Sequence, residues 1–194
     1  LNLNRTIEKF KNLLRRTIRE DIEIKIIPAP DIRTIEADIG QVEQVIMNLS
    51  VNAQDAMPHG GELILETAMV KIDSDYGTVH TDTQPGWYVM LAISDSGCGI
   101  DEETRKHIFE PFFSTKGEQG TGLGLATVFG IVKQHGGNIW VYSEPEKGTT
   151  FKIYLPASEE VLPEKKHRKK PTGDIGGSET ILLVEDNELV RELG

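Results

Sequence analysis

The segment from Ile39 to Met57 limits the possible folds of this chain more than any other. At about 100° per residue its apolar side chains fall within one broad arc, which is typical of an amphipathic helix. They are Ile39, Val42, Val45, Ile46, Leu49, Ala53, Ala56 and Met57. The run Pro58-His59-Gly60-Gly61 then ends the pattern. We therefore predict a long helix with one face on a hydrophobic core.

Shorter apolar runs elsewhere predict five strands and two further helices. Gly86–Ser94 is apolar almost throughout, which favours a strand in the centre of a sheet. The other predicted strands are Ile22–Ile26, Glu62–Lys71, Asn138–Ser143 and Thr149–Leu155, and the other helices are Leu3–Ile18 and Leu123–His135. Between Asp95 and Gly124 glycines dominate, and only a short helix near Asp101–His107 is predicted. Irregular stretches of this length inside a domain are usually binding loops or lids.

The overall charge restricts the classes of partner. A net charge of -10 repels nucleic acid and anionic lipid, so any anion site must be local. No apolar run reaches the roughly 20 residues needed to span a membrane, and the polar N-terminus lacks the layout of a signal peptide. The single cysteine, Cys98, cannot form an internal disulfide, which favours the cytoplasm. Because the chain does not begin with Met, we expect a piece of a longer protein.

The long helix carries a second, polar stripe opposite its apolar arc. Gln41, Gln44, Asn48, Asn52 and Asp55 recur at spacings of three and four residues, which place them on one face. Asn has poor helix propensity, so two of them need a reason. One interpretation is ordinary surface polarity. The other is that the amide oxygen of Asn52 ligates Mg²⁺, which takes oxygen ligands and often binds together with substrate phosphates.

Asp95 directly follows the apolar strand and precedes Gly97 and Gly99. Asp-Ser-Gly can be an ordinary turn in which the carboxylate bonds its own backbone. As a site, the carboxylate would accept a hydrogen bond from the exocyclic amine of adenine and would disfavour guanine, which presents an acceptor there. The two glycines would let the backbone pass close to the base.

The run Gly120-Thr121-Gly122-Leu123-Gly124-Leu125-Ala126 leads into a predicted helix, whose free amides and dipole could bind phosphate. It lacks the Gly-Lys-Ser/Thr of a P-loop and the preceding strand of a dinucleotide-binding turn. Phe109–Phe113 places three aromatic residues before it, either as a lid latch or as a small satellite core. Lys116 could reach a phosphate or lie in solvent.

Four motifs occur once each and in a specific order. They are Asn48-Leu49-Ser50-Val51-Asn52-Ala53, Asp95-Ser96-Gly97-Cys98-Gly99-Ile100, Phe109–Phe113 and Gly120–Leu125. In this order they resemble the N, G1, F and G2 boxes of the ATP-binding catalytic domain of bacterial sensor histidine kinases, within the broader GHKL ATPase group. The resemblance covers about Asn4 to Leu155. It implies an α/β (α+β) two-layer sandwich of the Bergerat type, with a mixed sheet of about five strands packed on three helices.

The resemblance also implies ATP and Mg²⁺ as cofactors and assigns roles to particular residues. Asn52 would hold Mg²⁺ between the phosphates, assisted by Asn48 and Asp55, and Lys116 would neutralise charge, so that Asn48, Asn52 and Lys116 are the implied catalytic residues. Asp95 would read adenine. The other residues implied at the nucleotide are Ala56, Gly97, Gly99, Ile100, Phe109, Gly120, Thr121, Gly122, Leu123, Gly124, Leu125 and Thr150.

Beyond these boxes, the resemblance suggests a domain order. Residues 1–19 would be a linker helix after dimerisation helices that lie outside this chain, residues 20–156 the catalytic domain, and residues 157–178 a linker. Residues 179–194 look like the start of a response-regulator receiver, as in a hybrid kinase. None of the five histidines is followed by Glu or Asp, so the phosphoaccepting histidine is expected outside the chain.

The implied function is transfer of the ATP γ-phosphoryl group to that histidine, for relay to a receiver aspartate. The parent would be a homodimer, whereas this chain alone would be a monomer that does not phosphorylate itself. One alternative is a hydrolytic GHKL ATPase, but those enzymes place a glutamate base four residues before the metal-binding Asn, where this chain has Asn48. The other is a module that senses adenine nucleotide without transferring phosphate.

Overall fold

The long helix is α2, which spans Ile39–Ala56 and confirms the strongest pattern in the sequence. Its N-cap is Asp38, whose side chain accepts a hydrogen bond from the Gln41 amide at 2.9 Å. This bond satisfies one of the amides that have no partner inside a helix. The buried side chains of α2 follow the predicted arc, except that Ile39 in the first turn is 46% exposed. The helix ends just before Pro58.

The computed structural model describes residues 1–73, 84–115 and 120–158, and these lie within one unit that spans Leu1–Leu162. Lys116 and the receiver-like segment 179–194 lie outside the described residues, as does nearly all of the predicted linker 157–178. No helix among the described residues is both long and apolar enough to cross a membrane.

Five strands form one mixed sheet, as the resemblance implied. They are β1 (Ile22–Ile27), β2 (Gly61–Ile72), β3 (Gly86–Asp95), β4 (Asn138–Ser143) and β5 (Thr149–Pro156). Their order across the sheet is β1-β2-β3-β5-β4, with β1 parallel to β2 and the other neighbours antiparallel. The apolar strand β3 is central, and its residues Tyr88–Ile93 are buried. The two-layer α/β fold class is therefore confirmed.

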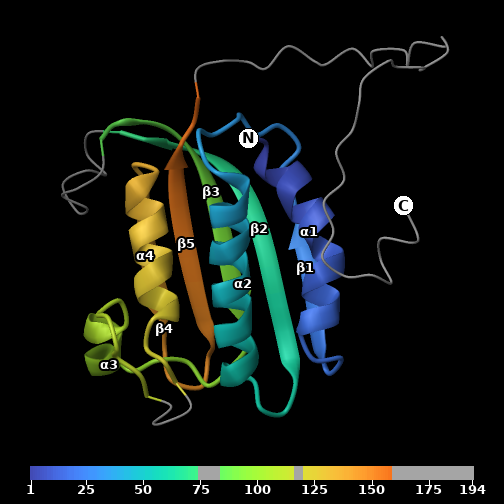
Figure 1. Ribbon diagram of the computed structural model, residues 1–194, viewed down its shortest axis with the longest axis vertical. Coiled ribbons are helices and arrows are strands. Elements are labelled where there is room, and N and C mark those ends of the chain that lie inside the picture. Colours follow the sequence, from blue (N-terminus) through green and yellow to red (C-terminus); the bar gives the residue numbers. More distant parts are fainter. Residues whose placement is uncertain (74–83, 116–119, 159–194) are drawn as a thin grey trace, which may run out of the picture. The chain divides into compact units, whose positions relative to one another are not determined.

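Helices α1 (Leu3–Thr17), α2 and α4 (Gly124–Gln134) cover one face of this sheet (Figure 1). Their apolar side chains share a single core with alternate residues of the strands, among them Leu63, Leu91 and Phe151. Leu3, Ile7 and Leu14 of α1 are at most 1% exposed in this core. Its predicted role as the link to dimerisation helices concerns residues outside the chain and stays a prediction.

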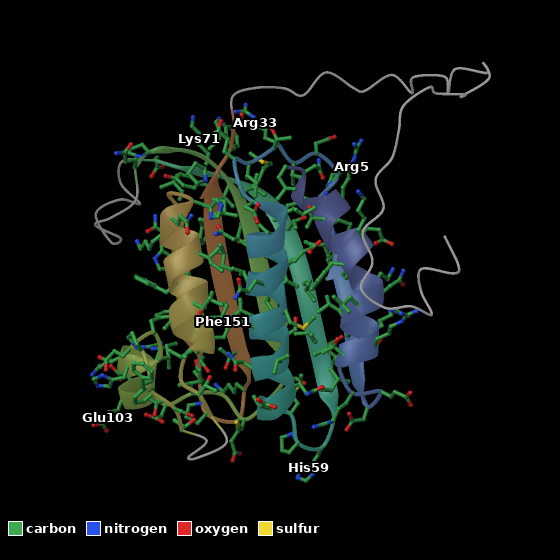
Figure 2. All side chains as sticks on the ribbon, in the orientation of Figure 1. Arg5, Arg33, His59, Lys71, Glu103 and Phe151 are labelled. Atoms are coloured by element: carbon green, nitrogen blue, oxygen red, sulfur yellow. The ribbon has the colours of Figure 1, made fainter. Side chains whose placement is uncertain are left out.

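One end of the sandwich brings together the ends of two elements and the beginning of a third. There α2 and β3 end while α4 begins, and the short helix α3 (Glu102–His107) lies nearby (Figure 1). In Figure 2, His59 marks this end, whereas Arg33 and Lys71 mark the opposite end. The described residues of the four motifs lie on α2, at the end of β3, at the start of α4, or in the segments that join β3 to α4.

Candidate nucleotide-binding site

Asp95 is the last residue of β3, and backbone amides fix its carboxylate. Its Oδ1 accepts a hydrogen bond from Gly97 N–H at 2.9 Å and another from Thr149 N–H at 3.3 Å. Among the described residues no hydrogen bond reaches Oδ2. One oxygen is thus held by the protein and the other is left to accept a hydrogen bond from a ligand.

Burial raises the pKa of the Asp95 carboxyl above its ordinary value, although the two backbone hydrogen bonds act in the opposite direction. An ionised carboxylate loses solvation when it is buried, and a ligand donor can compensate for that loss. Carboxyl groups with a perturbed pKa are often found at functional sites, which makes Asp95 a candidate.

The loop after β3 is joined closely to the end of α2. Cys98 N–H donates to the Ala56 carbonyl at 3.0 Å. A Cβ on Gly97 would lie 2.6 Å from that carbonyl oxygen, closer than real Cβ contacts, so only glycine fits there. The predicted residues Ala56, Asp95 and Gly97 therefore lie together, although Ala56 contributes here through its backbone.

The same loop also lies against the turn between β4 and β5. Gly99 has a φ of +70°, and a Cβ there would be 2.0 Å from the Glu144 carbonyl oxygen. Glu146 N–H donates to the Cys98 carbonyl at 2.7 Å, and Ile100 N–H donates to Ser143 Oγ at 2.8 Å. In the described structure, Gly99 and Ile100 thus anchor the loop to the sheet.

The two asparagines of α2 lie beside the first turn of α4. Asn48 Nδ2 donates to the Gly124 carbonyl at 3.3 Å. The side-chain nitrogen of Asn52 lies 4.0 Å from the point that a Cβ on Gly124 would occupy. Because Asn48 and Asn52 are one helical turn apart, both amides meet the glycine-rich start of α4.

The N-terminus of α4 has properties suited to an anion. Its N-cap is Leu123, which offers no side-chain acceptor to the first amides of the helix. Thr121 Oγ1 accepts from Leu123 N–H at 3.4 Å, which precedes the helix. The first-turn amides, which include that of Leu125, therefore lack a side-chain cap, and a phosphate could accept their hydrogen bonds.

The aromatic motif contacts the glycine-rich motif through its backbone. Phe112 N–H donates to the Gly122 carbonyl at 3.0 Å, and a Cβ on Gly122 would be 2.3 Å from the Phe112 carbonyl carbon. Phe112 itself has a φ of 67°, a strained value for a bulky residue, and its side chain is 77% exposed. Phe109 packs against the core and contacts the Phe129 ring at 5.3 Å between centroids.

One implied residue, Thr150, lies on the face of the sheet opposite the helices. Ser94 and Thr150 are partners across β3 and β5, and their hydroxyls are 2.9 Å apart. Successive side chains of a strand point to opposite faces, so Thr150 faces away from the side on which Phe151 joins the helices. Thr149, which the sequence analysis missed, lies opposite Asp95 on the helix-covered face and bonds to it.

The remaining implied residues have less defined contacts. Asp55 and Asn52 each have an interaction partner, and Gly120 lies at the edge of the described residues. No cluster of three or more His, Cys, Asp or Glu side chains suited to a metal occurs in the described ranges. Amide and phosphate oxygens suit Mg²⁺, and the position of Asn52 beside α4 is compatible with that donor set.

Residues 37–159 match the family described as histidine kinase-, DNA gyrase B- and HSP90-like ATPases. The chain is 42% identical to the sensor kinase CckA of Brucella abortus over 98% of its own length and 21% of that protein. It is 39% identical to sporulation kinase A of Bacillus subtilis, over 80% of this chain and 23% of that protein. The chain thus spans less than a quarter of the length of either relative.

Solved structures show the same fold. The mycobacterial sensor histidine kinase MprB superposes with a TM-score of 0.63 at 29% identity, over 81% of this chain and 95% of MprB. The catalytic domain of the histidine kinase ThkA gives a TM-score of 0.64 at 30% identity, over 80% and 95% of the two chains. This chain therefore belongs to the histidine kinase-, DNA gyrase B- and HSP90-like ATPase family, as a catalytic domain of the sensor histidine kinase type.

Proposed function

We propose that this chain binds Mg²⁺-ATP and, within a longer parent protein, transfers the γ-phosphoryl group to a histidine on dimerisation helices that lie outside it. The observation that carries this proposal is the meeting of the α2 amides with the uncapped start of α4. Phosphoryl transfer depends mainly on positioning and charge compensation, and this arrangement offers amide oxygens for the metal and backbone amides for phosphate. A solved relative, ShkA, was crystallised in complex with AMPPNP and has a TM-score of 0.65 at 26% identity.

Each described group has a defined part in this proposal. Asp95 accepts a hydrogen bond from the adenine amine through Oδ2, while Gly97 and Gly99 leave room for the base. The first-turn amides of α4, together with Gly122 and Gly124, bind phosphate oxygens. Asn52 would hold Mg²⁺, which would screen the phosphate charge. The incoming histidine nitrogen then forms a bond to γ-phosphorus as the bond to the β-phosphate oxygen breaks, and ADP leaves.

Asn48 favours transfer over hydrolysis. A general base must remove a proton from the attacking water, and an amide cannot take up that proton at neutral pH. Its Nδ2 is moreover engaged by the Gly124 carbonyl. The hydrolytic alternative therefore lacks the general base that hydrolytic GHKL ATPases carry four residues before the metal-binding Asn, because this chain has Asn48 there.

We further propose a cytoplasmic location and a response-regulator partner. The structure of ThkA in complex with the response regulator TrrA, at 28% identity and a TM-score of 0.61, supports a partner of this class. The receiver segment at 179–194 lies outside the described residues and remains part of the proposal.

A labelling experiment tests the transfer. The chain is incubated with ATP labelled at the γ-phosphate, alone and with the parent's dimerisation helices added as a separate polypeptide. We expect no label on the chain alone and slow labelling of the added helices, because tethering in the parent supplies an effective concentration in about the millimolar range. The label should be acid-labile and alkali-stable, as a phosphorus–nitrogen bond is.

Two other results would select the alternatives. Rapid phosphate release by the chain alone, lost in Asn48→Ala, would identify a hydrolytic ATPase. ATP binding with neither label nor release in the presence of the helices would identify a nucleotide-sensing module.

A further inference from the structure

Three polar side chains form a row across the sheet at its nucleotide end. Ser143 of β4 pairs with Thr149 of β5, and Thr149 pairs with Asp95 of β3. Directly paired residues of neighbouring strands point to the same face, so all three side chains lie on the face that the helices cover. Neither Ser143 nor Thr149 belongs to the four motifs.

The hydroxyl of Ser143 makes three hydrogen bonds. It donates to the Gly148 carbonyl at 3.0 Å and accepts from Ile100 N–H at 2.8 Å. Thr149 Oγ1 lies 2.9 Å away, and because the Ser143 proton is already used, Thr149 is the donor in this pair. One donated and two accepted bonds are the full capacity of a serine hydroxyl. This group therefore fixes a loop, a turn and a neighbouring strand at one point.

The parts that Ser143 joins are those that hold the Asp95 carboxylate. A Cβ on Gly148, whose φ is +85°, would be 2.0 Å from the Asp95 carbonyl oxygen, so the turn touches the Asp95 backbone directly. Thr149 supplies one of the two amides that bind Asp95 Oδ1. Ile100 ends the loop whose Gly97 amide supplies the other. The Ser143 hydroxyl thus holds both segments that carry a donor to Oδ1, namely the loop with the Gly97 amide and the start of β5 with the Thr149 amide.

We propose that Ser143 is a positioning residue for nucleotide specificity, which keeps Asp95 Oδ2 aimed at the exocyclic amine of adenine. This inference rests on the proposed function, in which Asp95 reads the base. Without the hydroxyl, Ile100 N–H and the Thr149 hydroxyl lose their acceptor, and the Gly148 carbonyl loses its donor. The loop and the turn can then move apart, and the carboxylate distinguishes less well between an amine and a carbonyl on the purine.

The test compares two nucleotides in Ser143→Ala and in the unchanged protein. Calorimetry gives the dissociation constants of Mg²⁺-ATP and of Mg²⁺-inosine triphosphate, which has a carbonyl oxygen where adenine has its amine. We expect the unchanged protein to prefer ATP. In Ser143→Ala the preference should fall by about two- to tenfold, which is less than the loss expected when the whole charged bond to adenine disappears, because the Asp95 carboxylate is still present. Affinity for inosine triphosphate should change less than affinity for ATP.

Two control variants separate positioning from general stability. Ser143→Thr keeps the hydroxyl and should keep most of the preference for ATP. Thr67→Val removes another buried hydroxyl, which accepts from Ala29 N–H at 3.0 Å and donates to Asn4 Oδ1 at 2.7 Å, near the middle of β2. It should lower the melting temperature and leave the nucleotide preference unchanged.

The outcomes distinguish the two proposals. No preference for ATP in the unchanged protein would overturn the reading of adenine by Asp95. If the unchanged protein prefers ATP and Ser143→Ala keeps that preference, the role of Ser143 is overturned while that of Asp95 stands. The role of Ser143 is also overturned if Thr67→Val loses as much of the preference for ATP as Ser143→Ala does. If Ser143→Ala does not fold, Thr149→Val removes one partner of Ser143 and keeps the amide to Asp95. A smaller shift in the same direction is then expected, and no shift would refute the inference.

Discussion

Replacing Asp95 by asparagine tests the centre of the proposed site with almost no change in shape. The structure determines how the new amide must lie. Gly97 and Thr149 N–H groups both point to the Oδ1 position, and only the amide oxygen can accept from them. The NH₂ group is therefore placed where Oδ2 stood, so that it presents a donor to the adenine amine.

The expected loss follows from the bond that disappears. A hydrogen bond to a charged group is worth about 1.5–3 kcal/mol, which corresponds to about a 10- to 150-fold weaker affinity. Two donors facing each other add to this loss, because the buried adenine amine is left without an acceptor. Affinity for ATP should therefore fall by at least about tenfold. Most of this loss should come from the contact between residue 95 and the adenine base.

Calorimetric titration of Mg²⁺-ATP into the unchanged protein and into Asp95→Asn measures this loss. Circular dichroism of both proteins shows that the variant is folded. Inosine triphosphate serves as the internal control, since its carbonyl accepts from the new NH₂ group and its affinity should fall less or rise. Unchanged affinity for ATP in a folded Asp95→Asn protein would remove Asp95 from the site.

The same variant should change how stability depends on pH in the absence of nucleotide. Because burial raises the pKa of Asp95 in the folded chain, the folded state binds this proton more tightly than the unfolded state does. The stabilisation from Asp95 is complete below its ordinary pKa and is lost as pH rises through the raised value. The asparagine in Asp95→Asn has no proton to lose in this range. The free energy of unfolding of Asp95→Asn, relative to that of the unchanged protein, should therefore increase as pH rises from the ordinary pKa of Asp through the raised pKa of Asp95. Urea unfolding at a series of pH values measures it, and a decrease would contradict the assigned cause.

Four further substitutions, one of them a control, test the phosphate end of the proposed site and its surroundings. Asn52→Ala should weaken ATP binding in Mg²⁺ more than in a metal chelator, and equal losses by calorimetry would exclude Asn52 as a metal ligand. Gly122→Ala places a Cβ 2.3 Å from the Phe112 backbone and should lower nucleotide affinity. Gly130→Ala, the matched change in α4 with nothing within 4 Å, should instead raise the melting temperature by about 1–4 °C and leave affinity unchanged. Phe112→Gly relieves a φ of 67° on a side chain that is 77% exposed, so chemical denaturation should show no loss of stability.

The sequence predicted the elements of the fold because their signals are local. The arc of α2 and the continuous apolar run of β3 follow from periodicity and burial, and both elements were found within one or two residues of their predicted bounds. The order of strands across the sheet was not predicted from these patterns. The position of β5 between β3 and β4 depends on pairing between residues far apart in the chain.

The sequence identified candidate site residues only where a motif contains them. Asp95, Asn48 and Asn52 stand in such motifs. Thr149 does not, because choosing between Thr149 and Thr150 requires the register of β5 against β3, and a shift of one residue reverses the face. Ser143 carries no sequence signal beyond its place at the end of a predicted strand. Gly148, five residues later, was the nearest signal, since a glycine after a strand indicates a tight turn.

Asn48 shows why the choice between transfer and hydrolysis is tied to the packing of the helices. Its amide donates to the Gly124 carbonyl, which belongs to the first residue of α4. A carboxylate at this position would have no proton to donate, and it would place two acceptors against each other. A general base could therefore be introduced at position 48 only with the loss of a contact that sets the start of α4 against α2. The Asn48 amide, which cannot act as a base, also helps to hold the proposed phosphate-binding turn in place. Both features favour the proposal that the site positions ATP for an acceptor supplied from outside the chain.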